Sequence, residues 1–258
     1  MSAEAVDQGT VDISVDDKGV ATIEFFHPLS NSLPGKVLRK LAKAIEDSGN
    51  DDSIKVIVVK SGGDRAFCAG ASFDELISID NLETGKEFFS GFAGVINAMR
   101  KAPKFVLCRV QGKAVGGGVG LAAAADHTFA TSHASVKLSE LAVGIGPFVV
   151  GPAVERKVGT SAFTDMTIDA TSWKTAGWAR SKGLYTEIFD DAEHMDEAIH
   201  KLVDQLCKSN PEAMALLKKV FWEGTENWDD LLAERAEMSG KLVLSDFTRN
   251  AINAFKKK

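Results

Sequence analysis

The chain has 258 residues, of which 45% are hydrophobic and 26% are charged, a composition typical of a globular protein in water. The net charge of −6 argues against a nucleic-acid-binding protein, because such proteins carry a basic face. No apolar run approaches the ~18 residues of a membrane span, and the first ten residues, MSAEAVDQGT, are unlike a signal or transit peptide. The three cysteines are widely spaced, which indicates reduced thiols and no zinc site. We therefore expect a cytoplasmic protein with no metal and with no nucleic-acid or membrane partner.

The first half of the chain predicts strands and helices in alternation. Residues 11–15 and 20–25 alternate apolar and polar residues around a turn that ends at Gly19, which predicts a β-hairpin. Residues 54–59 form a continuous apolar run, typical of a strand buried on both faces. The other elements expected here are helices at 34–47, 73–79 and 87–101, a strand at 105–110 and a helix that begins near Gly118.

The second half of the chain becomes increasingly helical towards its end. Extended segments are expected at 129–130, 135–138 and 185–189. Helices are expected at 152–158, 161–168, 172–182, 195–209, 211–221, 228–239 and 245–255. Because glycine-rich mixed structure gives way to helices near residue 195, we predict one unit at 1–195 and a C-terminal helical region at 196–258.

Two glycine-rich segments each run from a strand towards a helix. The first spans residues 61–72, and the second spans residues 111–121 and contains Gly116, Gly117 and Gly118 in succession. Glycine lets a ligand approach the backbone closely, and the first turn of a helix has unpaired N–H groups at the positive end of its dipole. Such junctions can bind a phosphate, a carboxylate or the oxyanion of a polarised carbonyl. Tight turns that serve packing alone would explain the same glycines.

A dinucleotide-binding motif is a rival interpretation of the second segment. Residues 118–123 fit the pattern G-x-G-x-x-A, and Glu140 follows at about the 20-residue spacing of that motif. The motif requires a strand that runs directly into its first glycine, whereas Gly112 and Lys113 interrupt the strand here. The motif also usually opens the first βαβ unit of a chain. Dinucleotide binding is therefore the less favoured interpretation, while anion binding and packing alone both stay open for this segment.

Three separate motifs together resemble the crotonase, or enoyl-CoA hydratase/isomerase, superfamily. They are AFCAGAS at 66–72, residues 111–126 with the triple glycine, and SELAVGIGP at 139–147, with further matches at 31–33, 182–184 and 251–255. The resemblance implies an α/β fold, namely a spiral of ββα turns with a C-terminal helical region, assembled as a homotrimer or a dimer of trimers. It also implies an acyl-CoA thioester as the ligand, with coenzyme A as part of the substrate and no separate cofactor.

The resemblance also assigns site residues. In this family two backbone N–H groups bind the thioester oxygen, and their positions match Ala71 and Gly117. A glutamate that acts as acid and base matches Glu140. The residues expected to contact the acyl-CoA are Ala69, Gly118, Gly120 and Phe148, together with Phe255 and Lys258 from a neighbouring subunit.

Gly120 departs from the family pattern, because family hydratases typically carry a second glutamate there. One carboxylate could still support hydration by returning the proton that it takes from water, and double-bond isomerisation needs only one base. Members that resemble methylglutaconyl-CoA hydratase also show G-x-G-L followed by L-S-E, with prolines that match Pro147 and Pro152. We therefore expect hydration of a 2-enoyl-CoA. A Δ3,Δ2-enoyl-CoA isomerase and a non-catalytic acyl-CoA-binding protein are the alternatives.

Three other polar residues near these motifs are expected to have structural roles. Asp126 lies six residues after Gly120 and would point away from that position on a helix. His127 and His133 lack a partner at metal-ligand spacing, which favours ordinary turn or surface positions.

Overall fold

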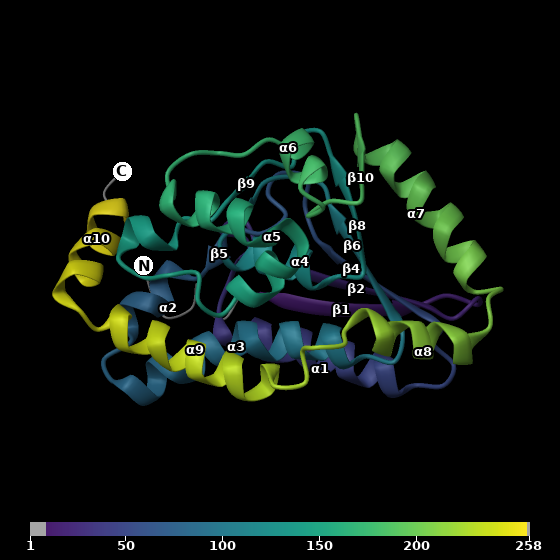
Figure 1. The fold of residues 1–258 in the computed structure, drawn as a ribbon, viewed down its shortest axis with the longest axis horizontal. Helices are drawn as coiled ribbons and strands as arrows, with labels where there is room; N and C mark the ends of the chain where they lie inside the picture. Colours follow the sequence, from purple (N-terminus) through teal and green to yellow (C-terminus); the bar gives the residue numbers. More distant parts are fainter. Residues whose placement is uncertain (1–8, 257–258) are drawn as a thin grey trace.

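The computed structural model describes the backbone of residues 9–256 and the side chains of residues 9–254. Its central feature is a six-stranded sheet in the order β1-β2-β4-β6-β8-β10 (Figure 1). β1 and β2 form the predicted antiparallel hairpin, with Gly19 at a φ of 86°, and the other neighbouring strands are parallel. The six strands are β1 (Thr10–Val15), β2 (Val20–Phe26), β4 (Val56–Ser61), β6 (Phe105–Val110), β8 (His127–Thr131) and β10 (Glu187–Phe189).

Two short parallel pairs accompany the large sheet. β3 (Ser32–Leu33) pairs with β5 (Gly70–Ala71), and β7 (Ala114–Val115) pairs with β9 (Val136–Lys137). A bridge between Cys68 and Ala114 joins the two pairs. Each short strand follows a strand of the large sheet and precedes a helix. The orders are β2-β3-α1 (Gly35–Asn50), β4-β5-α2 (Phe73–Ser78), β6-β7-α4 (Gly117–Ala124) and β8-β9-η2 (Glu140–Val143), of which η2 is a 3-10 helix. This repeated order matches the predicted spiral of ββα turns.

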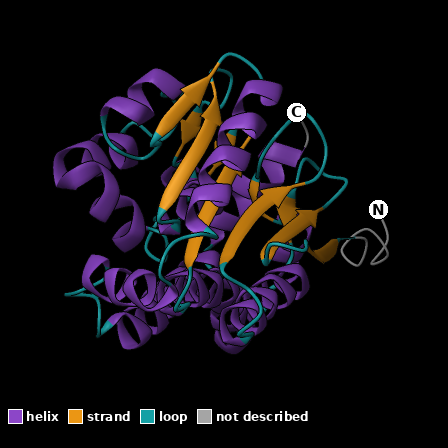
Figure 2. Ribbon diagram, turned by 90° about the vertical axis from the view of Figure 1, so that its right-hand side faces the viewer, coloured by secondary structure: helices purple, strands orange, loops and turns teal. Residues whose placement is uncertain are grey.

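Helices cover both faces of the large sheet (Figure 2). Ile57 and Val59 of β4 belong to the main core, which also contains residues of α1 (Gly35–Asn50) and α3 (Leu82–Lys101). Val56 and Val58 face the opposite way and pack against Met195, Ile199 and Val203 of α7 (Ala192–Leu206). Because successive side chains of a strand point to opposite faces, a strand covered on both sides is apolar throughout, as predicted for residues 54–59.

α3 and α9 (Trp228–Val243) pack closely side by side (Figure 1). Gly85 and Gly240 meet where they cross, and a Cβ added to Gly85 would lie 2.9 Å from Gly240 Cα. The two glycines therefore permit a backbone approach that side chains would prevent. Ser239, the neighbour of Gly240, thereby reaches the cavity described below.

Most predicted elements are confirmed, but the short strands β3, β5 and β7 were not predicted, and two helices begin at other residues than expected. α3 begins at Leu82 instead of residue 87, because the Asn81 side chain accepts a hydrogen bond from Thr84 N–H and caps a longer helix. Residues 172–175 are not helical, and α6 begins at Ala176 with Thr175 as its N-cap.

The bounds of the remaining helices are close to those predicted from the sequence. α5 (Gly151–Ile168) is kinked at Gly159, where a φ of 78° interrupts the helix between the segments predicted at 152–158 and 161–168. The predicted division at residue 195 falls within α7 and stays a prediction.

No helix within the described residues combines the length and apolarity that crossing a membrane requires. The remaining elements are α6 (Ala176–Ser181), α8 (Pro211–Phe221) and α10 (Asp246–Lys256).

Candidate active site

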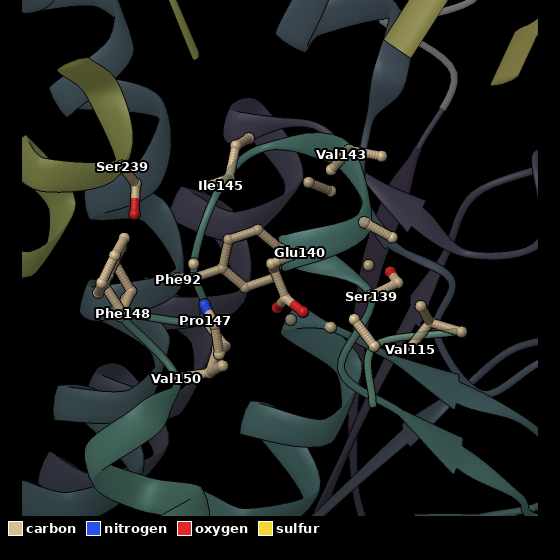
Figure 3. A pocket seen from close by; sticks show the side chains of 18 of the residues that line it. Phe92, Val115, Ser139, Glu140, Val143, Ile145, Pro147, Phe148, Val150 and Ser239 are labelled. Carbon is tan, nitrogen blue, oxygen red and sulfur yellow. The ribbon is translucent and has the colours of Figure 1, made fainter. Parts of the chain in front are cut away.

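A cavity of about 380 Å³ is formed where the short strands meet η2, α3 and α9. Its lining includes residues 69–71, 115–117 and 145–150, together with Phe89 and Phe92 of α3. This volume lies within the range of small-molecule sites. The lining is mostly apolar, and its polar side chains are Lys137, Ser139, Glu140, Thr171 and Ser239. Figure 3 shows Ser139, Glu140 and Ser239 among them.

Strand geometry directs the Ala71 N–H away from its partner strand. Ser72 N–H donates to Leu33 O over 3.1 Å, across the pairing of β5 with β3. Successive N–H groups in a strand point to opposite edges, so the Ala71 N–H points away from β3. Ala71 itself lines the cavity. Its N–H, which is not directed at β3, is therefore a candidate donor to a ligand there.

The second candidate amide opens helix α4. Gly117 is the first residue of α4, and the carbonyl of Gly116 accepts hydrogen bonds from Val119 and Gly120. The Gly117 N–H has no acceptor within the helix, because the first N–H groups of any helix lack one. It also lies at the positive end of the helix dipole. Gly117 lines the same cavity as Ala71.

Backbone hydrogen bonds hold the two glycine segments against each other. Val115 N–H donates to Cys68 O over 2.9 Å. A Cβ added to Gly70 would lie 3.0 Å from Val115 O and 3.7 Å from the Gly117 nitrogen. With a φ of 90° at Gly70, only glycine suits this close approach. The first segment therefore lies directly beside the Gly117 amide.

The 3-10 helix η2 positions the Glu140 carboxylate over the triple glycine. A Cβ added to Gly116 would lie 2.9 Å from Glu140 Oε1, so the carboxylate packs directly on the Gly116 backbone. Ile145 N–H donates to the Glu140 carbonyl over 3.0 Å and fixes the turn. Figure 3 shows the carboxylate projecting into the cavity, with Phe92 and Val150 around it.

One oxygen of this carboxylate lacks a partner. Glu140 Oε2 is buried and accepts no hydrogen bond from any described residue. Burial raises the pKa of Glu140 from 4.5 to about 7, partly offset by a hydrogen bond from its own backbone, because the charged form loses its hydration. A carboxyl group with a pKa near neutrality both accepts and releases a proton readily at physiological pH. Glu140 therefore has the environment of an acid-base group.

Gly120 and Gly118 serve packing in this structure, and neither is part of the cavity lining. A Cβ added to Gly120 would lie 2.4 Å from Val150 Cγ1, and one added to Gly118 would lie 2.6 Å from Cys68 O. Val150 therefore occupies the space that a side chain at position 120 would need. Glu140 is the single carboxylate that lines the cavity among residues 9–254.

Ala69 and Phe148 both line the cavity, as predicted for contacts with the ligand. Small size at Ala69 leaves room beside the Ala71 amide. The Phe255 side chain and Lys258, which were predicted to contact coenzyme A, lie outside the described residues.

Asp126 has a structural role, as expected. Its carboxylate accepts hydrogen bonds from Lys218 Nζ over 2.5 Å, from Trp222 Nε1 over 2.8 Å and from Val106 N–H over 2.8 Å. This buried group connects α8 to strand β6. His127 Nε2 lies 3.2 Å from Glu187 Oε1 at the edge of the large sheet, away from the cavity lining.

Comparison with known proteins identifies the family of this chain. Residues 16–258 match the family model described as enoyl-CoA hydratase/isomerase. The chain belongs to this family. The family assignment and the α/β fold predicted from the sequence are thereby confirmed.

Relatives and solved structures of this enoyl-CoA hydratase/isomerase family member include several hydratases. Human mitochondrial methylglutaconyl-CoA hydratase is 28% identical over 200 residues, which cover 76% of this chain and 58% of the human protein. The short-chain-enoyl-CoA hydratase of Clostridium acetobutylicum is 27% identical over 241 residues, which cover 92% of this chain and 90% of that protein. The crystal structure of enoyl-CoA hydratase from Bacillus halodurans has a TM-score of 0.87 at 20% identity, covering 95% of this chain and 99% of the other. One from Mycobacterium avium has a TM-score of 0.82 at 24% identity, covering 100% and 97%.

Lys137 and Val150 are among the cavity residues that the sequence did not single out. Lys137 follows the buried Val136 in β9, so the alternation of that strand could have placed it on the cavity side. Val150 had no comparable signal, because its contact with Gly120 joins residues that are distant in the chain.

Proposed function

We propose that this protein adds water to the double bond of a 2-enoyl-CoA thioester. The observation that carries the proposal is one buried, unpartnered carboxylate oxygen, on Glu140, in a cavity that the Ala71 and Gly117 amides also border. Membership of the family supports it, as do the relatives named as hydratases, one of which is covered over 90% of its length.

The two amides would stabilise the charge that develops during the reaction. A thioester oxygen placed between the Ala71 and Gly117 N–H groups gains negative charge as the bound acyl group takes on enolate character. Donors that are already aimed at this oxygen need no rearrangement, and losing one typically lowers kcat about 10²- to 10³-fold. The positive end of α4 adds to the same stabilisation.

Glu140 would perform both proton transfers. As the carboxylate, it takes a proton from water while the water oxygen bonds to C3 of the enoyl group. The electrons of the double bond move to C2 and onto the thioester oxygen. The carboxyl group then returns the same proton to C2, so that one molecule of water is added and Glu140 is regenerated. One carboxylate is sufficient because the proton that it accepts is the proton that it donates.

Double-bond isomerisation is the second candidate reaction. The observation that favours it is Val150 in the place of a second carboxylate, because moving a proton between two carbons of the acyl group needs a single base. A non-catalytic acyl-CoA-binding protein is the third candidate and would use the same cavity without turnover.

The experiment that separates these candidates is incubation with crotonyl-CoA, a 3-enoyl-CoA and methylglutaconyl-CoA, followed by mass spectrometry and chromatography. Hydration adds the mass of one water, whereas isomerisation moves the double bond without changing the mass. Glu140→Gln should abolish turnover but retain binding of butyryl-CoA, an unreactive analogue. Full turnover by this variant would remove Glu140 from the mechanism, and no turnover by the wild type would favour the binding protein.

The role of the Ala71 amide can be tested without changing its side chain. Incorporation of lactic acid in place of Ala71 replaces the N–H by an ester oxygen. We expect a loss of about 10²-fold or more in kcat, and a change of less than about twofold would exclude this donor from the site.

We further propose that the protein acts in the cytoplasm, needs no cofactor beyond the coenzyme A of its substrate, and assembles as a homotrimer or a dimer of trimers. Exposed apolar residues on α8, among them Leu216, Val220 and Phe221, support association through this face. Light scattering coupled to size-exclusion chromatography measures the assembly directly.

A further inference from the structure

A pair of lysines flanks one tryptophan at the edge of the cavity. Lys137 Nζ lies 4.5 Å from the centre of the Trp173 ring, and Lys113 Nζ lies 4.8 Å from the same centre. Lys137 lines the cavity and is paired in register with Val115, another lining residue. Lys113 and Trp173 are exposed. The Lys113–Trp173–Lys137 cluster therefore connects the cavity with solvent.

Neither lysine is neutralised within the part of the chain whose side chains are described. Lys137 and Lys113 form no ion pair with residues 9–254, whereas Lys174 nearby contacts both Asp165 and Asp169. Burial lowers the pKa of Lys137, and the charge of Lys113 lowers it further. Two ammonium groups that share one ring repel each other, and an anion between them would remove that repulsion.

The position of Lys137 decides which part of an acyl-CoA could supply this anion. The Lys137 carbonyl accepts the Gly116 N–H over 2.8 Å, so its backbone lies next to the proposed thioester site. A lysine side chain reaches about 6 Å on its four-carbon stem. A carboxylate at the end of a five-carbon acyl chain lies four C–C bonds from the thioester carbon, or about 5 Å.

The phosphates of coenzyme A lie farther along the substrate from the thioester than this carboxylate does. Cysteamine, β-alanine and pantoate units, joined by two amide bonds, separate the sulfur from the nearest phosphate, which makes about 13 bonds or roughly 16 Å when the arm is extended. The cavity is otherwise mostly apolar, so an uncharged acyl chain would leave Lys137 without a partner.

From this geometry we infer that Lys137, held on Trp173 beside Lys113, binds a carboxylate at the far end of the acyl group, and that the preferred substrate is the mono-CoA thioester of an unsaturated dicarboxylic acid. This inference rests on the proposed function, since it names the substrate class of the same site. Lys137 would determine specificity and would take no part in the proton transfers by Glu140.

The test compares two substrates that differ only in the distal carboxylate, glutaconyl-CoA and crotonyl-CoA. Lys137→Met keeps the length of the side chain but removes its charge. We expect kcat/KM for glutaconyl-CoA to fall about tenfold or more, as for a lost charge-assisted hydrogen bond, while crotonyl-CoA changes less than about twofold. Lys182→Met, an exposed site outside the cavity lining, is the matched control for the change in net charge, and both substrates should be unaffected.

Three outcomes would overturn the inference. The first is equal activity of Lys137→Met and wild type with glutaconyl-CoA. The second is an equal loss with both CoA substrates. The third is a loss that disappears when N-acetylcysteamine thioesters, which lack the phosphates, replace the CoA thioesters, because Lys137 would then contact coenzyme A. If Lys137→Met does not fold, as judged by circular dichroism, Lys137→Gln is used under the same criteria.

A binding measurement separates this inference from the proposed function. Calorimetry with glutaryl-CoA and butyryl-CoA, which cannot be hydrated, should show tighter binding of glutaryl-CoA by wild type and loss of that preference in Lys137→Met. If wild type turns over neither enoyl substrate but keeps this preference, the hydratase proposal fails and the carboxylate site stands. If hydration occurs and the preference is absent, the carboxylate site fails and the hydratase proposal stands.

Discussion

Replacing Glu140 by glutamine should stabilise the folded protein at alkaline pH even though it abolishes the proposed chemistry. Glutamine has nearly the same shape as glutamate but cannot carry a charge. The buried Oε2 of Glu140 has no hydrogen-bond partner among the described residues, so the ionised form is held in the cavity without compensation. The variant removes this cost and keeps the packing against Gly116.

The magnitude follows from the pKa of Glu140. Burial raises that pKa from 4.5 to about 7, so the folded state binds the proton more tightly than the unfolded state. The resulting contribution to stability is fully present below pH 4.5 and is lost as the pH rises through 7. At about 1.4 kcal/mol per pH unit, the free energy of unfolding of wild type is lower by roughly 3 kcal/mol at pH 8 than below pH 4.5. Glu140→Gln has no such loss, because its side chain does not ionise.

The assay is urea denaturation of both proteins at pH 5 and at pH 8, at one fixed protein concentration because assembly contributes to stability. We expect the free energies of unfolding to be similar at pH 5 and the variant to be more stable by roughly 2 to 3 kcal/mol at pH 8. Glu234→Gln, on the exposed side of α9, is the control, and it should show no such dependence. A variant that gains nothing between pH 5 and pH 8 would refute the argument that the Glu140 carboxylate is held without compensation.

Three further results are expected. The kcat/KM for crotonyl-CoA should rise with pH to a plateau, with a midpoint near 7, because the proposed base is the carboxylate of Glu140; a flat profile from pH 5.5 to pH 9 would exclude this. Gly120→Ala should lower the free energy of unfolding by about 1 to 3 kcal/mol, and Val150→Ala should recover part of that loss in a double-mutant cycle, whereas additive effects would show that the two sites do not touch. Asp126→Asn should cost about 3 kcal/mol or more, because it leaves the buried Lys218 ammonium without its anion, while kcat measured well below the unfolding temperature should stay unchanged.

Local patterns in the sequence predicted most of the elements and the family. The apolar run at 54–59 indicated a doubly covered strand, and Gly19 marked the hairpin turn, because burial and positive φ each restrict the choice of residue at those positions. The two glycine segments were found in the same way, whereas Glu140 was assigned through the resemblance of the motif at 139–147 to the family. Elements that depended on caps were placed less well, as at Leu82 and Ala176, because a cap is a contact of one side chain with a neighbouring N–H group and has no periodicity.

Only the tertiary structure showed the consequence of having glycine at position 120, where family hydratases typically carry a second glutamate. The sequence showed glycine at position 120 but could not show that Val150 fills the space beside it, since this contact joins α4 to the start of α5. Likewise, the sequence contained Lys113, Lys137 and Trp173 but gave no reason to group them, because strand pairing brings them together. A local sequence pattern reflects the backbone conformation and the burial of each residue. The chemistry of this cavity depends on which distant side chains share it, and that is a property of the packed chain.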